Sequence, residues 1–189
     1  MGQCGNQEDG SPGCLVAGNA ALLLGRTLIG GRVWDVMRVV DAVETYFSDR
    51  ITMEGSLLMG LSGGGTATYY TACLEPRFSC YMPAGAVCTY KDSIVAMQHC
   101  TCNYIPGIAK WFDMGDLAAM IAPRKLVIVH GKDDPIFPIE GTEECFRIIQ
   151  ELYHTAGAAD HCELVVGDGP HRFFEAEAWP AVLNMLEHN

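Results

Sequence analysis

Positive charge is scarce in this sequence. Among its 189 residues, 12 lysines and arginines stand against 23 aspartates and glutamates, which gives a formal net charge of −11. No basic cluster offsets this excess, although proteins that bind nucleic acid or an anionic membrane normally present one. We therefore expect neither nucleic acid nor a membrane among the partners, and we interpret the acidity as favouring solubility.

Long hydrophobic runs are also missing. Residues 1–10 have neither the basic start nor the apolar core of a signal peptide. The apolar run from residue 14 to residue 29 is interrupted by Asn19 and Arg26, so it is a poor membrane span. The nine cysteines are odd in number and scattered, without the framework of a small disulfide-rich domain. Reduced thiols in a cytoplasmic protein fit this pattern best.

Metal-ligand pairs of the usual spacing are absent as well. His99, Cys100 and Cys102 lie close together, but zinc sites usually combine Cys-x-x-Cys with a second pair of ligands elsewhere. Here the spacing is Cys-x-Cys and no second pair exists. We expect buried thiols in a loop packed over a sheet, with no bound metal and no cofactor.

What the sequence does contain is an alternation of strand and helix patterns. This alternation predicts an α/β fold with one parallel sheet of about four strands, flanked by helices and ordered along the sheet as in the chain. No linker, repeat or low-complexity tract divides the chain, so we expect a single domain over residues 1–189, with a loop-like N-terminus over residues 1–18 and a helix break at Gly30-Gly31. The predicted strands are 56–59, 79–85, 125–130 and 162–166, and the predicted helices are 19–28, 32–47, 66–74, 116–121, 140–155 and 175–187.

The stretch 57–65 contains the clearest chemical signal. An apolar strand ends in Gly60-Leu-Ser62-Gly-Gly64, and a helical pattern follows. Gly-x-Ser-x-Gly between strand and helix is typical of a strained turn that exposes a nucleophilic serine hydroxyl. We expect Gly60 and Gly64 to lie where a side chain would clash. The N–H of Gly63, at the start of the helix, would face a developing oxyanion.

A serine is a weak nucleophile until a base accepts its proton and an acid orients that base. In a parallel sheet such groups gather at the carboxyl ends of the strands. Asp134 follows the strand 125–130, and His171 lies in a glycine–proline loop after the last strand, which reproduces the chain order Ser, Asp, His. Asp133 is the alternative acid, whereas Asp168 fits a turn former.

Four segments resemble α/β-hydrolases of the acetyl xylan esterase and dienelactone hydrolase kind, from about residue 4 to near the end of the chain. They are the serine turn, the stretch 99–107, the acid loop 130–138 and Gly169-Pro-His171-Arg-Phe, and the helix containing Trp34-Asp-Val-Met-Arg38 is similar too. The resemblance implies a nucleophile Ser62, an acid Asp134, a base His171 and a small-molecule ester or related acyl substrate.

The resemblance covers only the carboxyl-terminal half of such domains. It therefore leaves the second oxyanion donor unassigned, and it leaves the strand 56–59 at an open sheet edge where chains could self-associate. Two alternatives to an acetyl-type serine esterase follow. One is a serine peptidase of the prolyl-oligopeptidase type, which shares the serine turn. The other is a catalytically impaired fragment.

Overall fold

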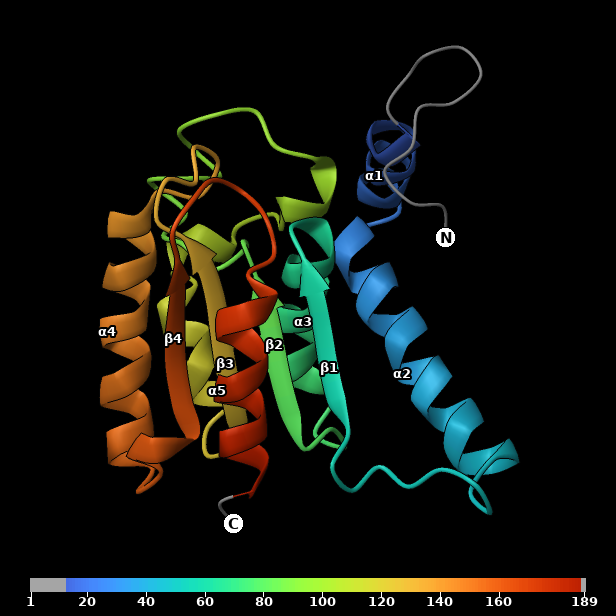
Figure 1. The fold of residues 1–189 in the computed structure, drawn as a ribbon. Coiled ribbons are helices and arrows are strands. Elements are labelled where there is room, and N and C mark those ends of the chain that lie inside the picture. The colour runs from blue at the N-terminus through green and yellow to red at the C-terminus, as the bar shows by residue number, and fades with distance from the viewer. Residues whose placement is uncertain (1–12, 188–189) are drawn as a thin grey trace.

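A computed structural model describes residues 13–187 of the chain. Four strands form one parallel sheet in the order β1 (Leu57–Leu61), β2 (Cys80–Ala84), β3 (Lys125–Gly131) and β4 (Cys162–Gly167) (Figure 1). Each strand therefore lies beside its predecessor in the chain, and β1 lies at one edge. The α/β class, the four parallel strands and their sequential order are confirmed.

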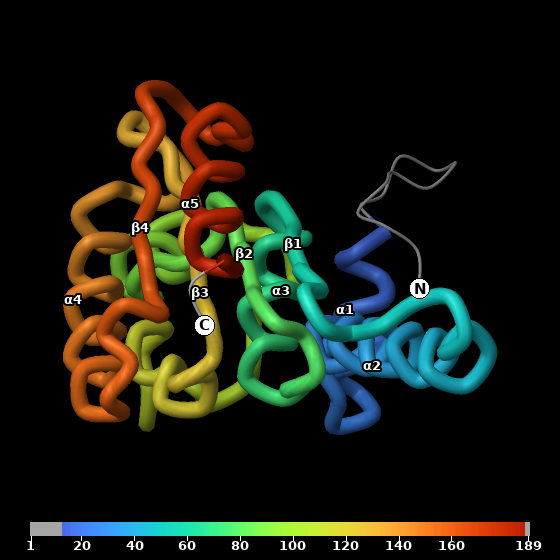
Figure 2. Tube along the Cα trace, turned by 60° about the horizontal axis from the view of Figure 1, so that its bottom comes forward, coloured from blue at the N-terminus to red at the C-terminus, as the bar shows by residue number. Residues whose placement is uncertain are grey.

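Helices cover both faces of the sheet, but unequally. In Figure 1, α5 crosses one face, while α3 and α4 lie on the other and α2 stands outside α3. Figure 2 shows α1 and α2 together beyond the β1 edge. The helices are α1 (Gly13–Leu23), α2 (Leu28–Tyr46), α3 (Gly63–Leu74), α4 (Ile139–Thr155) and α5 (Glu175–Glu187), with short 3-10 turns η1 (Thr101–Asn103), η2 (Ile108–Lys110), η3 (Gly115–Met120) and η4 (Ala159–His161).

Strand β3 shows why the sheet buries two cores. Leu126 and Ile128 face the core beneath α3 and α4, whereas Val127 and Val129 face the core beneath α5. Successive side chains of a strand point to opposite faces, so a strand covered on both sides needs apolar residues at every position. This explains the continuous apolar run that predicts this strand.

The loop after β4 is fastened to the α5 face of the sheet. Phe174 is buried, and its ring occupies the space where a side chain at Gly167 would begin. The same ring packs with the apolar residues that α5 presents to the sheet. The loop from Gly167 to Phe174, which contains His171, is thus held at both ends.

The N-terminal region differs from the prediction in two respects. Residues 1–12 lie outside the described part of the chain, but residues 13–18 are helical rather than loop, because they open α1. Gly30 and Gly31 do not break a helix and belong to the first turns of α2. The break lies at Gly25, whose φ of 66° is left-handed, and α2 then starts with Thr27 accepting a hydrogen bond of 3.0 Å from the Gly30 N–H.

Between residues 13 and 187, no single helix combines the length and apolar composition of a membrane span. Helices α1 and α2 meet that test only when counted together, and their axes differ by 96°.

The β1 edge leaves apolar surface uncovered. Met59 and Leu61, on the α5 side of β1, are each 40% exposed. Helix α2 packs on α3 instead of on this face; its Val33 and Val40 are buried, whereas Trp34 is 56% exposed. Only the predicted edge position of β1 is thereby confirmed; self-association remains a prediction.

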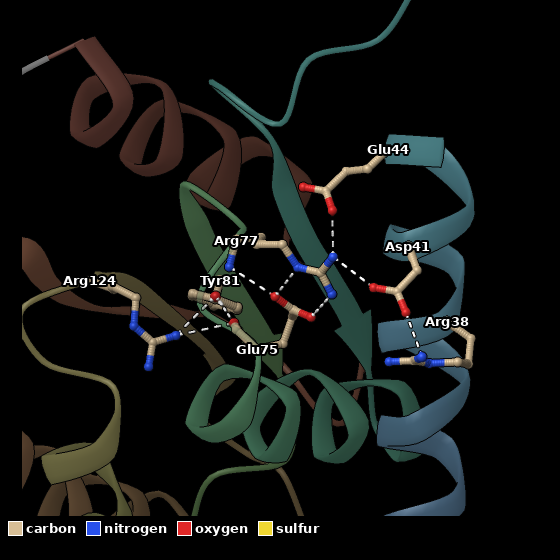
Figure 3. Close-up of polar contacts among 7 residues, drawn as sticks. All are labelled: Arg38, Asp41, Glu44, Glu75, Arg77, Tyr81 and Arg124. Carbon is tan, nitrogen blue, oxygen red and sulfur yellow. Dashed lines mark hydrogen bonds and ion pairs between the residues drawn. The ribbon is translucent and has the colours of Figure 1, made fainter. Parts of the chain in front are cut away.

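A cluster of charged groups fastens α2 to the C-terminal end of α3 (Figure 3). Arg77 donates to both oxygens of the buried Glu75 carboxylate, in part through an Nε contact of 2.7 Å. Its Nη1 also donates to Asp41 at 2.8 Å and to Glu44 at 2.6 Å, both on α2. One arginine therefore neutralises a buried carboxylate and joins α2 to the segment that follows α3.

Candidate active site

Ser62 lies in the turn between β1 and α3, as its sequence motif predicts. Its backbone has φ 56° and ψ −120°, and it is the one non-glycine residue with positive φ in the described chain. This conformation is strained for an L-residue and is maintained by the surrounding packing. The backbone N–H of Ser62 donates to the carbonyl of Ala84 at 2.9 Å, which ties the turn to the end of β2.

The structure confirms one of the two predicted glycine clashes in this turn and not the other. A Cβ at Gly60 would collide with the backbone of Gly64, as expected. A Cβ at Gly64 itself would meet nothing within 4 Å, so the predicted clash there is wrong. The crowded position is Gly65, where a Cβ would strike the carbonyl oxygen of Ala84. Close packing of α3 on β2 is therefore the reason for the third glycine.

Ser62 opens onto a cavity of about 310 Å³. The cavity is formed where the serine turn meets the segment around η1 and the loop after β3. Its wall consists of Ser62, Gly63, Gln98, His99, Cys100, Cys102, Asn103, Ile136 and Phe137. A small polar substrate could reach the serine hydroxyl here.

Asp134 and His171 contact each other beside this cavity. Nδ1 of His171 lies 2.6 Å from Oδ2 of Asp134, and the Asp134 side chain is fully buried. The other carboxylate oxygen, Oδ1, accepts hydrogen bonds from the N–H groups of Ile136 at 2.8 Å and Phe137 at 3.1 Å. Burial raises the pKa of Asp134, but the hydrogen bonds from His171 and the two N–H groups outweigh it and lower the pKa below its usual value. The carboxylate is therefore ionised and oriented toward the imidazole.

The His171 ring is held by packing as well. It stacks on Phe137 with ring centroids 5.8 Å apart, and it lies against Gly85, where an added Cβ would be 2.9 Å from Cε1. Gly85 has a φ of 52° at the end of β2. Nε2 of His171 is buried and has no hydrogen-bond partner within residues 13–187, so it is not bonded to Ser62 here. Catalytic hydrogen bonds are commonly long without substrate and tighten when it binds.

The backbone also joins the acid loop to the histidine loop. The N–H of Lys132 donates to the carbonyl of Gly167 at 2.9 Å, and the N–H of Asp133 donates to the carbonyl of Gly169 at 3.0 Å. Asp133 is exposed, as is Asp168, and the hydrogen bond of His171 is made with Asp134 instead. Of the three candidate acids, the structure brings only Asp134 to the histidine.

His130 is a buried core residue near the end of β3. Its Nε2 donates to the carbonyl of Phe137 at 2.7 Å, and the Thr142 hydroxyl lies 3.3 Å from the ring. Burial lowers the pKa of His130, which keeps the ring neutral. The hydrogen bond to Phe137 holds the loop that follows β3, and His130 does not line the cavity.

The His99–Cys102 segment forms part of the cavity wall. Nε2 of His99 lies 3.1 Å from the Ser93 hydroxyl, and the ring packs 5.3 Å from that of Phe137. The Cys100 and Cys102 sulfurs are 3.1 Å apart, and Cys102 is buried with Cys14 against α1 and α2. No group of three potential metal ligands occurs within residues 13–187.

Sequence reasoning missed several contributors to the site. Phe137 contacts two of the site histidines, and Gly85 provides the floor beneath His171. Gly85 directly follows β2 and Phe137 shortly precedes α4, and in both places tertiary packing determines the positive φ or the buried ring. A glycine at the last position of the predicted strand 79–85 was the one available signal for Gly85.

Comparison with known proteins supports the fold. No protein-family model matches this chain. The curated "Putative hydrolase YtaP" of Bacillus subtilis is 27% identical over 151 residues, covering 77% of this chain and 48% of the relative. A "4-O-methyl-glucuronoyl methylesterase 1" of Wolfiporia cocos is 25% identical over 167 residues, covering 75% and 41%. The chain thus spans about half the length of the curated relatives it matches.

Two solved structures have the same architecture. One is a carbohydrate esterase family 15 glucuronoyl esterase from Caldicellulosiruptor kristjansonii, with TM-score 0.65, 22% identity and coverage of 82% of this chain and 47% of the other. The second is described as a "putative acetyl xylan esterase" from Bacteroides fragilis, with TM-score 0.65, 15% identity and coverage of 90% and 42%. This chain therefore has the α/β-hydrolase fold and is similar to carbohydrate esterases of that superfamily over about half of their length.

Proposed function

We propose that this chain is a serine hydrolase of carboxylic esters, with Ser62 as nucleophile, His171 as base and Asp134 as the acid that orients it. One observation carries the proposal. The strained Ser62 turn and the Asp134–His171 hydrogen bond of 2.6 Å are brought to the same edge of one parallel sheet. Functional groups of open α/β sheets gather at this edge.

The proposed reaction has two steps, acylation of Ser62 and hydrolysis of the acyl-serine, and His171 acts in both. Nε2 of His171 accepts the Ser62 proton while Oγ attacks the ester carbonyl carbon, and the Gly63 N–H stabilises the negative oxygen. The imidazolium then gives its proton to the leaving alcohol, and an acyl-serine remains. Water attacks the acyl-serine with His171 as base, which releases the carboxylic acid and restores Ser62. The ionised Asp134 keeps Nδ1 protonated and stabilises the imidazolium.

The substrate we propose is a small ester, of the acetyl type. The names of two similar proteins describe an acetyl ester of xylan and a methyl ester of a glucuronoyl group. Both are carboxylic esters of carbohydrates, and the cavity of about 310 Å³ suits a small group at Ser62. The sugar supplies the alcohol in an acetyl ester of xylan and the acid in a methyl ester of glucuronate. An assay with p-nitrophenyl acetate, run beside an assay with methyl glucuronate, shows which kind of ester is preferred.

Labelling with a fluorophosphonate probe tests the nucleophile directly, because the probe reacts with activated serines. We expect the wild-type chain to be labelled and to hydrolyse p-nitrophenyl acetate, and we expect Ser62→Ala to lose both while its melting temperature stays close to that of the wild type. Ser56→Ala is the matched control, since Ser56 is half-buried just before β1, at the opposite end of that strand from Ser62.

Equal labelling of Ser62→Ala and the wild-type chain would refute the assignment. Hydrolysis of peptide amides in preference to both esters would instead favour the peptidase alternative. A chain that folds but is neither labelled nor active would favour the impaired-fragment alternative.

A further inference from the structure

The proposed oxyanion site has one donor accounted for. The Gly63 N–H begins α3, and the first N–H groups of a helix have no partner within it. Esterases of this mechanism use at least two donors, and losing one typically lowers turnover about 100- to 1,000-fold. Residues 13–30 contain helix and turn but no strand followed by a loop that could bring a second backbone N–H to Ser62.

A side chain from α2, that of Arg32, approaches the start of α3. Nη1 of Arg32 is 3.3 Å from the position that a Cβ at Gly63 would occupy. Gly63 itself lines the cavity together with Ser62. The guanidinium therefore reaches the residue whose N–H is the first oxyanion donor, although β1 separates the two residues in the chain.

The Arg32 side chain is also oriented by its surroundings. It is half-buried, and Nη2 donates to the sulfur of Cys14 at 3.4 Å. Nη1 of the same planar guanidinium lies at the start of α3. Helix α2 itself is fixed on α3 by the Arg77 contacts at its other end. The position of Nη1 is thus set by two anchored helices.

We propose that Arg32 is the second oxyanion donor of this site, and that its Nη1 hydrogen-bonds the carbonyl oxygen of the ester as Ser62 attacks. This inference rests on the proposed esterase function. A guanidinium is permanently charged, so its hydrogen bond strengthens as negative charge develops on that oxygen. Arg32 then acts on the transition state more than on the bound ester, and its removal affects kcat more than KM.

The absence of a side chain at residue 63 fits this role. An alanine there would place its Cβ within 3.3 Å of Nη1, which is tighter than an ordinary van der Waals contact. The guanidinium would have to shift by a few tenths of an ångström. Gly63→Ala should therefore lower kcat measurably but by less than removal of Arg32.

The test compares Arg32→Gln and Arg32→Lys with Arg38→Gln as the matched control. Arg38 lies on the same helix, packs over the Trp34 ring and pairs with Asp41 at 2.6 Å, away from the cavity. The measurements are kcat and KM for p-nitrophenyl acetate, the rate of fluorophosphonate labelling, the melting temperature, and activity with added millimolar methylguanidinium.

We expect Arg32→Gln to lower kcat about 100-fold or more, with KM changed less than about threefold and the melting temperature nearly unchanged. Methylguanidinium should restore part of the lost activity in Arg32→Gln and should not affect Arg38→Gln. Arg32→Lys, which keeps the charge but loses the fork, should lose about tenfold, so it tests the role even where Arg32→Gln fails to fold.

Three outcomes would overturn the inference. If Arg32→Gln and Arg32→Lys both keep the wild-type kcat while Ser62→Ala is inactive, the esterase proposal stands and the role of Arg32 is wrong. If kcat falls only in proportion to a lower melting temperature and is not rescued, Arg32 is purely structural. If the wild-type chain shows neither labelling nor hydrolysis, both proposals fail together.

Discussion

Replacing Arg77 by alanine should destabilise the fold severely. Arg77 is the counterion of the Glu75 carboxylate, which is 1% exposed, and it donates to both carboxylate oxygens. Removing one partner of a buried ion pair leaves an uncompensated charge, at a cost of about 3–5 kcal/mol. The half-exposed contacts to Asp41 and Glu44 add less, on the order of 0.2–1 kcal/mol each. A domain of ordinary stability would lose a large part of its 5–15 kcal/mol.

The loss of stability in Arg77→Ala should depend on pH. The hydrogen bonds from Arg77 lower the pKa of Glu75, so the folded state favours the ionised carboxylate. The pair therefore stabilises the fold above the unfolded-state pKa of about 4.3, and this contribution is lost as pH falls through the lower folded pKa. In Arg77→Ala, by contrast, protonation relieves the buried charge. The difference between wild type and variant should be largest near pH 7 and smaller near pH 4.

Urea unfolding followed by circular dichroism measures both effects. Arg50→Ala is the control, because its contact with Asp49 at 3.6 Å is exposed and contributes at most about 1 kcal/mol. Adding Glu75→Gln to Arg77→Ala should recover part of the loss by removing the buried charge. A loss below about 1 kcal/mol at pH 7, or a difference that does not change with pH, would refute the reasoning.

Three further predictions concern the site and the sheet edge. Asp134→Asn should lower kcat on the order of 10,000-fold by changing the tautomer of the base, whereas Asp133→Asn should leave kcat unchanged; the reverse order in an ester assay would exchange their roles. Elemental analysis should find no stoichiometric zinc, and Cys100→Ser should not alter metal content; zinc lost on that substitution would establish a metal site. Size-exclusion chromatography with light scattering should show self-association of the wild-type chain that Met59→Arg reduces, because the substitution puts a charge on the exposed face of β1; a wild-type monomer would contradict it.

Local patterns were sufficient to predict the strands and the sheet edge at which the acid and the base meet. The run from Leu126 to Val129 is apolar at every position because both faces of β3 are covered. Asp134 and His171 follow strands whose carboxyl ends lie at the same edge, so strand order predicts their proximity, but it does not select Asp134 over Asp133.

The predictions that failed concern which of several glycines is crowded by a residue distant in the chain or adopts a left-handed backbone. Gly30 and Gly25 look alike in sequence, yet Gly25 ends the helix through its left-handed backbone, whereas a Cβ at Gly30 would lie 2.9 Å from the Thr27 hydroxyl that caps α2. Gly64 and Gly65 differ only in which one faces β2. The approach of Arg32 to Gly63 joins two helices, and helical periodicity carries no information about such a contact.

The fastening of Phe174 against Gly167 has a consequence for how the molecule loses activity on heating. Within residues 13–187, α5 is the one helix covering its face of the sheet, and the His171 loop leads directly into it. An opening confined to α5 would free Phe174 and carry the base away from Asp134, while β1 to β3 and their helices stay assembled. Such partial openings occur below the temperature of global melting. Inactivation should therefore precede the loss of bulk helical signal, and amides of α5 should exchange with solvent deuterium sooner than those of β3.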